Sequence, residues 1–153
     1  MFKESETNVK HFKHIGGAES TTTEWKQSLA ELKEIIETVA AFANTEGGRI
    51  FIGVSPEGKA VGVQIGKGTI EKLVNQIAQN IDPKVHPKVM IKKIDGKELI
   101  VVEVKESHDH LVLAFGRPYK RVGRPAVKTS KDEYERLIFE KHKDKLHFDT
   151  MIC

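Results

Sequence analysis

Acidic and basic residues that could act on a phosphodiester lie close together near the start of the chain. Glu19 and Glu24 are followed by Lys26, and Glu57 lies further along. Carboxylates on one face of a sheet could hold Mg²⁺ or Mn²⁺ against a phosphodiester, while a lysine neutralises the developing charge. These four residues are therefore candidates for catalysis, and the three carboxylates for metal binding. The alternative is a solvated strand face, since Glu and Lys are ordinarily exposed.

A second group of candidates is basic and lies in the C-terminal third of the chain. It consists of Arg117, Tyr119, Lys120, Arg121, Arg124 and Lys128. Cations interleaved with an aromatic residue are typical of surfaces that bind phosphate and stack bases. A solvated edge strand, protected by its charge against aggregation, would have the same composition.

The third group surrounds paired glycines in the middle of the chain. Its members could offer backbone N–H groups, a hydroxyl and a guanidinium to phosphate: Asn44, Thr45, Gly47, Gly48 and Arg49. The glycines also suit a plain helix-to-strand connection, because glycine adopts positive φ without a Cβ clash. No Gly-Lys-Ser/Thr follows them, so the stretch is not a Walker loop and ATP hydrolysis is not expected here.

Few other residues indicate a cofactor. A metal site at His108-Asp109-His110 would need further ligands, and none lies nearby in the sequence. The only cysteine is Cys153, which excludes a disulfide framework and a cysteine-based zinc site. We expect no cofactor for binding, and Mg²⁺ or Mn²⁺ only if the carboxylates are catalytic.

Composition indicates a globular chain. The 153 residues are 31% charged with a net charge of +3, which alone is too little to prove a polyanionic partner. No apolar run reaches the length of a membrane span, and the first residues do not form a signal peptide. We expect one cytoplasmic domain without a membrane partner.

The elements that would position these residues follow from their periodicity. A strand is predicted over 19–26, and an apolar stripe at helical spacing predicts a helix over 28–43. The strand 50–54 follows the glycines, a turn follows at 55–58, and a return strand is expected at 60–63. Thr69 is the expected cap of a second helix that ends before Pro83.

A second hairpin is predicted around Asp95-Gly96, the strongest short hairpin signal. A two-residue turn there pairs Ile91 with Ile100, Val89 with Val102, and Lys93 with Glu98. Strands at 111–115 and 119–122 should flank a turn at 116–118. The Ser130…Glu133 capping box should open a last helix with Tyr134, Leu137 and Ile138 on one face.

These elements predict an α+β fold, a mixed and twisted β-sheet with two to three packed helices. We expect an N-terminal arm at 1–17, one globular domain at 18–140, and a linker or the start of a truncated region at 141–153. A further domain is expected after residue 153, and the sequence is compatible with a homo-oligomer.

Four segments together resemble a known family. They are Glu19-Ser-x-x-x-Glu-Trp-Lys26, Ala41-Phe-Ala-Asn-Thr-x-Gly-Gly-x-Ile-x-Ile-Gly-Val54, Gly58-x-x-x-Gly-Val63 and Tyr119-x-Arg-Val-Gly123. In order and spacing they resemble the Schlafen AlbA-type DNA-binding domain over roughly 18–138. The resemblance implies an AlbA-like fold that binds nucleic acid, often at the N-terminus of transcriptional regulators or helicase-related proteins. Older descriptions treated the family as a divergent AAA ATPase-like domain, so the resemblance also implies an ATP-binding label.

The resemblance also carries an enzymatic alternative. Related Schlafen domains are endoribonucleases with three carboxylates, of which two match Glu19 and Glu24. The third would be an aspartate just after the Ile-Gly-Val strand, where this chain has Ser55-Pro56-Glu57. Our leading hypothesis is therefore a non-enzymatic module that binds DNA or RNA. A metal-dependent endoribonuclease and a scaffolding or oligomerisation domain are the alternatives.

Overall fold

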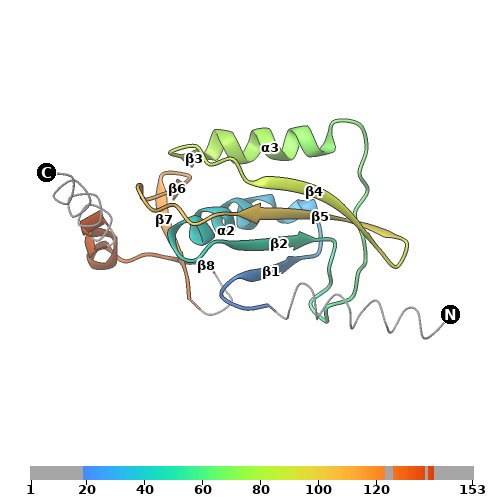
Figure 1. Ribbon diagram of the computed structural model, residues 1–153, viewed down its shortest axis with the longest axis horizontal. Helices are drawn as coiled ribbons and strands as arrows, with labels where there is room; N and C mark the ends of the chain where they lie inside the picture. The colour runs from blue at the N-terminus through green and yellow to red at the C-terminus, as the bar shows by residue number, and fades with distance from the viewer. Residues whose placement is uncertain (1–18, 123–125, 137, 140–153) are drawn as a thin grey trace, which may run out of the picture.

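The computed structural model describes residues 19–122, 126–136 and 138–139. It has the α+β architecture that the sequence predicts, with a central helix, α2 (Leu32–Asn44), that contacts strands of two four-stranded sheets. A second helix, α3 (Thr69–Asn80), runs alongside the first sheet (Figure 1). No helix in the described part of the chain is long and apolar enough to cross a membrane. The expected arm 1–17, Arg124, Leu137 and the segment 141–153 lie outside the described residues.

The first sheet is mixed, with strand order β1-β2-β5-β4. Its strands are β1 (Thr23–Lys26), β2 (Gly48–Ile52), β4 (Lys88–Ile94) and β5 (Lys97–Val104). β1 runs parallel to β2, and the other neighbours are antiparallel. The predicted hairpin register is confirmed, because Ile91 pairs with Ile100, Val89 with Val102 and Lys93 with Glu98.

The helix-to-strand connection also lies where the sequence places it. A short 3₁₀ helix, η1 (Leu29–Glu31), precedes α2, and α2 ends at Asn44. Gly47 then adopts a φ of +75° and its N–H donates to the carbonyl of Phe42 at 2.7 Å. β2 begins one residue later.

The second sheet has the order β3-β6-β7-β8. Its strands are β3 (Ile81–Asp82), β6 (Leu113–Ala114), β7 (Arg117–Arg121) and β8 (Ala126–Lys128). The predicted three-residue turn at 116–118 is wrong, because Phe115 and Gly116 form a two-residue turn and Arg117 already pairs with Ala114. β3 and β8 were not predicted, since strands this short carry no readable alternation.

Three other expectations are corrected. The strand predicted over 19–26 begins at Thr23, because Thr21 and Thr22 form a turn. The return strand at 60–63 is reduced to one bridge between Val54 and Ala60, and Gly62 there has a φ of +79°. Gly68, rather than Thr69, is the N-cap of α3.

At the predicted capping box, the Ser130 hydroxyl oxygen accepts a hydrogen bond from the backbone N–H of Glu133 at 3.3 Å.

The core lies on both faces of the first sheet. On one face α2 packs against Ile50 and Ile52, together with the inner side of α3. On the other face Phe51 is the centre of a smaller apolar cluster that Trp25 flanks. Because side chains alternate along a strand, every residue of β1 and β2 is thereby assigned to the α2 face or to the opposite face.

Candidate functional site

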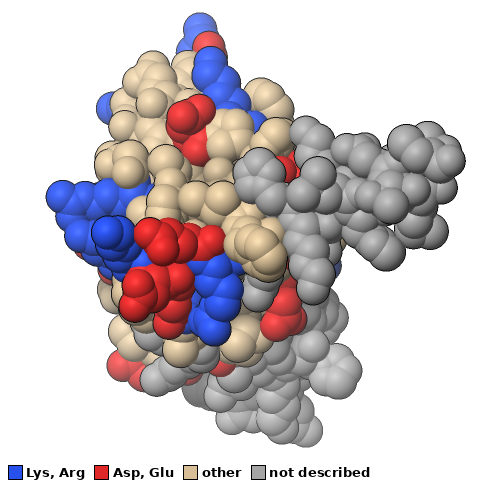
Figure 2. Space-filling view, turned by 90° about the vertical axis from the view of Figure 1, so that its left-hand side faces the viewer, with Lys and Arg blue, Asp and Glu red and all other residues tan. Residues whose placement is uncertain are grey.

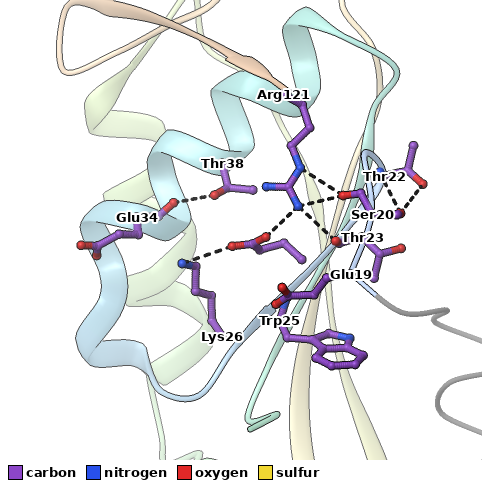
Figure 3. A network of polar contacts seen from close by, with 10 residues as sticks. Glu19, Ser20, Thr22, Thr23, Trp25, Lys26, Glu34, Thr38 and Arg121 are labelled. Carbon is purple, nitrogen blue, oxygen red and sulfur yellow. Dashed lines mark hydrogen bonds and ion pairs between the residues drawn. The ribbon is translucent and has the colours of Figure 1, made fainter. Parts of the chain in front are cut away.

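Arg121 is the centre of a polar network that joins β7 to the beginning of β1 (Figure 3). Its Nη2 donates to Oε1 of Glu24 at 2.7 Å and to the carbonyl oxygens of Ser20 and Thr23 at 2.9 and 3.1 Å. The second carboxylate oxygen of Glu24 lies 3.2 Å from the ammonium nitrogen of Lys26. Both oxygens of Glu24 are thus held by cations.

This placement corrects the expectation that Arg121 contacts phosphate. Its side chain has no exposed area, and its guanidinium carbon lies 5.0 Å from the centre of the Phe42 ring. Lys120 and Arg121 are adjacent in sequence, but strand alternation points them to opposite faces of β7. Arg121 therefore connects the two sheets from the inside.

The predicted carboxylates Glu19 and Glu24 line one pocket of about 530 Å³ at the free edge of β1. Its other lining residues are Trp25, Gln27, Glu31, Val54 and Pro56. Glu19 accepts the backbone N–H of Trp25 at 3.0 Å, and Glu31 accepts that of Gln27 at 3.0 Å. The N–H groups of Trp25 and Gln27 point away from β2. Glu19 and Glu31 accept the hydrogen bonds that a further strand would otherwise accept at this edge.

Glu57 does not line this pocket. It lies exposed in the turn after Val54, where a hydrogen bond from its own backbone N–H and one from Ser55 hold its pKa below the usual value. Within the described ranges, no three His, Cys, Asp or Glu side chains are grouped as metal ligands. Of the predicted carboxylates, Glu19 and Glu24 therefore share one pocket, whereas Glu57 lies apart from it.

The paired glycines are a packing requirement. A Cβ atom on Gly47 would lie 2.7 Å from the carbonyl oxygen of Val104. One on Gly48 would lie 2.7 Å from the carbonyl oxygen of Thr22 and 2.8 Å from the Phe42 ring. The turn can approach β5 and β1 this closely only without side chains.

Arg49 and the cations of β7 belong to different surfaces. Arg49 is half exposed, lies 3.5 Å from Glu103, and shares with Phe51 the face of the first sheet that points away from α2. β7 packs against α2 instead. Arg49 is therefore separated from the cations of β7 by the first sheet and by α2.

Asn44 and Tyr119 are buried, so neither can contact nucleic acid as predicted. The Asn44 amide donates to the carbonyl oxygens of Val112 and Tyr119 at 2.8 and 2.9 Å, and accepts the Val112 N–H at 2.8 Å. The Tyr119 hydroxyl donates to Glu37 at 2.9 Å. Burial, and then the hydrogen bond to Glu37, raise the pKa of Tyr119. The Thr45 hydroxyl donates to the carbonyl of Ala41 within the last turn of α2.

Two of the predicted cations are exposed on the second sheet, Arg117 and Lys128. Lys128 pairs with Tyr119, which places it on the same face as Arg117, at the diagonal position on the neighbouring strand. Lys120 points to the other face and forms an ion pair with Glu133. At the end of the molecule in Figure 2, Lys and Arg side chains lie beside Asp and Glu side chains, so charge there is mixed.

Glu31 lines the acidic pocket without having been predicted, although its sequence context carries a signal. Ser28-x-x-Glu31 is a capping-box pattern, in which the serine accepts a helix N–H and the glutamate reaches back along the chain. Ser28 accepts the Ala30 N–H at 3.1 Å, and Glu31 reaches back to Gln27. The loop with His108 and His110 is exposed, as expected, and His108 lies 3.7 Å from Glu106.

Comparison with known proteins identifies a family and solved structures with a similar fold, two of which are described below. The family model described as Schlafen, AlbA_2 matches residues 19–130. One similar structure is the DIP2311 protein from Corynebacterium diphtheriae, which is 18% identical and gives a TM-score of 0.63. The match covers 87% of this chain and 31% of the DIP2311 chain, so this chain spans about a third of that protein's length. The N-terminal domain of a Nitrosomonas europaea protein, named for its relation to the ATP-dependent DNA helicase RecG, is 21% identical with a TM-score of 0.53. That match covers 84% of this chain and 92% of that one. No curated protein matches.

Proposed function

The chain belongs to the Schlafen AlbA_2 family, and from this premise we propose that it is a nucleic-acid-binding domain of a transcriptional regulator. It would contact the phosphate backbone of DNA or RNA through cations of β7 and β8. The helicase-related name of one similar structure supports a nucleic-acid partner. The low identity of that structure limits the comparison itself to the fold.

The observation that carries this proposal is the pair of exposed cations on the second sheet. Arg117 and Lys128 lie on one face of neighbouring strands, and neither side chain forms an ion pair with a residue that the structure describes. Diagonal neighbours across antiparallel strands are roughly 7–8 Å apart, so one nucleic-acid backbone can contact both. By contrast, Arg121 and Lys120 are engaged by Glu24 and Glu133.

Fluorescence anisotropy with labelled DNA and RNA, measured over a range of salt concentrations, tests the proposal. Replacing Arg117 and Lys128 together by alanine should weaken binding of every sequence and lower the slope of log affinity against log salt by about 2. Lys59→Ala with Lys67→Ala removes the same charge from exposed positions of another loop and should change binding little. Equal losses in both double variants would refute the assignment to β7 and β8.

A wild-type chain that retains neither DNA nor RNA at low salt would refute the proposed function itself. A scaffolding or oligomerisation domain, with incidental surface cations, would then be the better account. Sedimentation of the same sample would show whether it self-associates.

The acidic pocket supports a second candidate function, an endoribonuclease. Glu19 and Glu24 line it together, and Lys26 holds one oxygen of Glu24. Incubation with transfer RNA and Mn²⁺, with and without chelator, tests this candidate. Glu24→Gln, which keeps an acceptor for Arg121, should abolish chelator-sensitive cleavage if the pocket is catalytic. Cleavage that survives this substitution would exclude the pocket.

A further inference from the structure

The turn between β6 and β7 carries a large aromatic side chain where its geometry disfavours one. Phe115 has a φ of +53°, and Gly116 follows with +74°. Positive φ is a rare outlier for a bulky residue, whereas Asn, Asp and Gly tolerate it. The fold therefore holds Phe115 in a conformation that its own backbone preferences oppose.

A second two-residue hairpin among the described residues provides an internal comparison. Between β4 and β5, Asp95 has a φ of +53° and Gly96 one of +73°, so the φ values of the two turns agree within a degree. Asp-Gly is the preferred sequence for such a turn. The turn geometry thus requires no aromatic residue, and another cause must account for phenylalanine at position 115.

Core packing does not supply that cause. Phe115 is 41% exposed and belongs to neither apolar cluster of the described residues. Its backbone N–H donates to the carbonyl of Asn80 at 2.9 Å, which fixes the hairpin tip against the end of α3. The hairpin thus presents part of the ring to solvent from an anchored backbone, at the end of the molecule where β3 follows α3 (Figure 1).

A cation accompanies the exposed ring. Arg117 is exposed and is separated from Phe115 only by Gly116. An aromatic face beside a cation is the combination that binds single strands, because a base stacks on the ring while the cation contacts phosphate. Duplex bases offer no free face for such stacking without being unstacked at a cost.

We propose that the tip of the β6–β7 hairpin binds an unpaired base, with Phe115 stacking on the base and Arg117 contacting the adjacent phosphate. This inference rests on the proposed function and specifies its ligand as single-stranded nucleic acid. The hydrogen bond of the hairpin backbone to Asn80 reduces the entropy lost on binding. Phe115 lies outside the four segments on which the family resemblance was built.

Anisotropy titrations of one oligonucleotide, single-stranded and annealed to its complement, test the inference. Phe115→Asn keeps a residue that tolerates the turn, and Phe115→Leu keeps an apolar side chain without a ring. Both should weaken single-strand binding by about 5- to 150-fold, the usual worth of one stacked base, and duplex binding much less. Phe139→Leu, at a described residue that is 67% exposed, is the matched control and should bind as wild type does.

Phe115→Trp gives an independent readout. The Phe115→Trp variant should retain single-strand affinity. Single-stranded nucleic acid should quench its tryptophan fluorescence more than it quenches the fluorescence of the wild type, whose only tryptophan is Trp25. Wild-type single-strand affinity in both Phe115→Asn and Phe115→Leu, or equal losses on single strand and duplex, would overturn the inference while leaving the proposed function intact. A wild-type chain that binds neither ligand would overturn both.

Discussion

Nη2 of Arg121 lies 2.7 Å from Oε1 of Glu24, in a contact from which solvent is almost fully excluded. The arginine was the expected phosphate ligand, and the glutamate was an expected catalytic carboxylate. Their pairing neutralises both charges and connects β7 to β1. Because the guanidinium also binds two backbone carbonyls, this contact stabilises the fold itself.

Arg121→Met should lower the free energy of unfolding by about 3–5 kcal/mol, because it leaves the buried Glu24 carboxylate without its main partner. Urea denaturation measures this loss. Arg117→Ala, at an exposed position of the same strand, should change stability by no more than about 0.5 kcal/mol. Adding Glu24→Gln to Arg121→Met should restore part of the loss, and strict additivity of the two effects would contradict direct coupling.

Asn44→Ala should lower the free energy of unfolding by about 3 kcal/mol. The substitution leaves two buried carbonyl groups and one N–H without their partner, each of which costs about 1 kcal/mol or more. Thermal denaturation followed by circular dichroism measures the effect. Asn75→Ala, on the exposed side of α3, is the control. A similar shift in both variants would show that the Asn44 bonds contribute little.

Gly47→Ala should destabilise the protein much more than Gly96→Ala. The two glycines have nearly the same φ, +75° and +73°, so the backbone strain of about 1–2 kcal/mol is common to both. Only at Gly47 does the new Cβ meet a carbonyl oxygen at 2.7 Å, whereas nothing lies within 4 Å of it at Gly96. Urea midpoints that agree for the two variants would remove the packing explanation.

Stability should fall at alkaline pH through Tyr119. Its pKa is raised in the folded state, so the protonated phenol is favoured by folding. That contribution is complete below the ordinary pKa of 10.0 and is lost as pH rises through the higher folded value. Ultraviolet titration of folded protein should show a tyrosine that ionises above pH 10.0, and Tyr119→Phe should remove this step. A titration curve that is unchanged in Tyr119→Phe would contradict the assignment.

The elements were largely predictable from local pattern. Apolar residues at helical spacing placed α2, and paired charges and β-branched residues around Asp95-Gly96 fixed the register of β4 with β5. Errors fell where glycine turns or very short strands carry little periodicity, as at 60–63 and in β8. The turn at Phe115 was misplaced because phenylalanine is not an expected residue at positive φ.

The site was predictable only as a set of residue types. Strand alternation alone could have separated Lys120 from Arg121, and the capping box could have identified Glu31. No local pattern, however, indicates that Arg121 meets Glu24 across 97 residues, or that Asn44 meets Val112 across 68. The sequence by itself determined the helices, most strands and one hairpin register, because these depend on neighbours a few residues apart. Only the tertiary structure decided which polar residues are buried and which cations remain exposed, because burial depends on contacts between segments far apart in the chain.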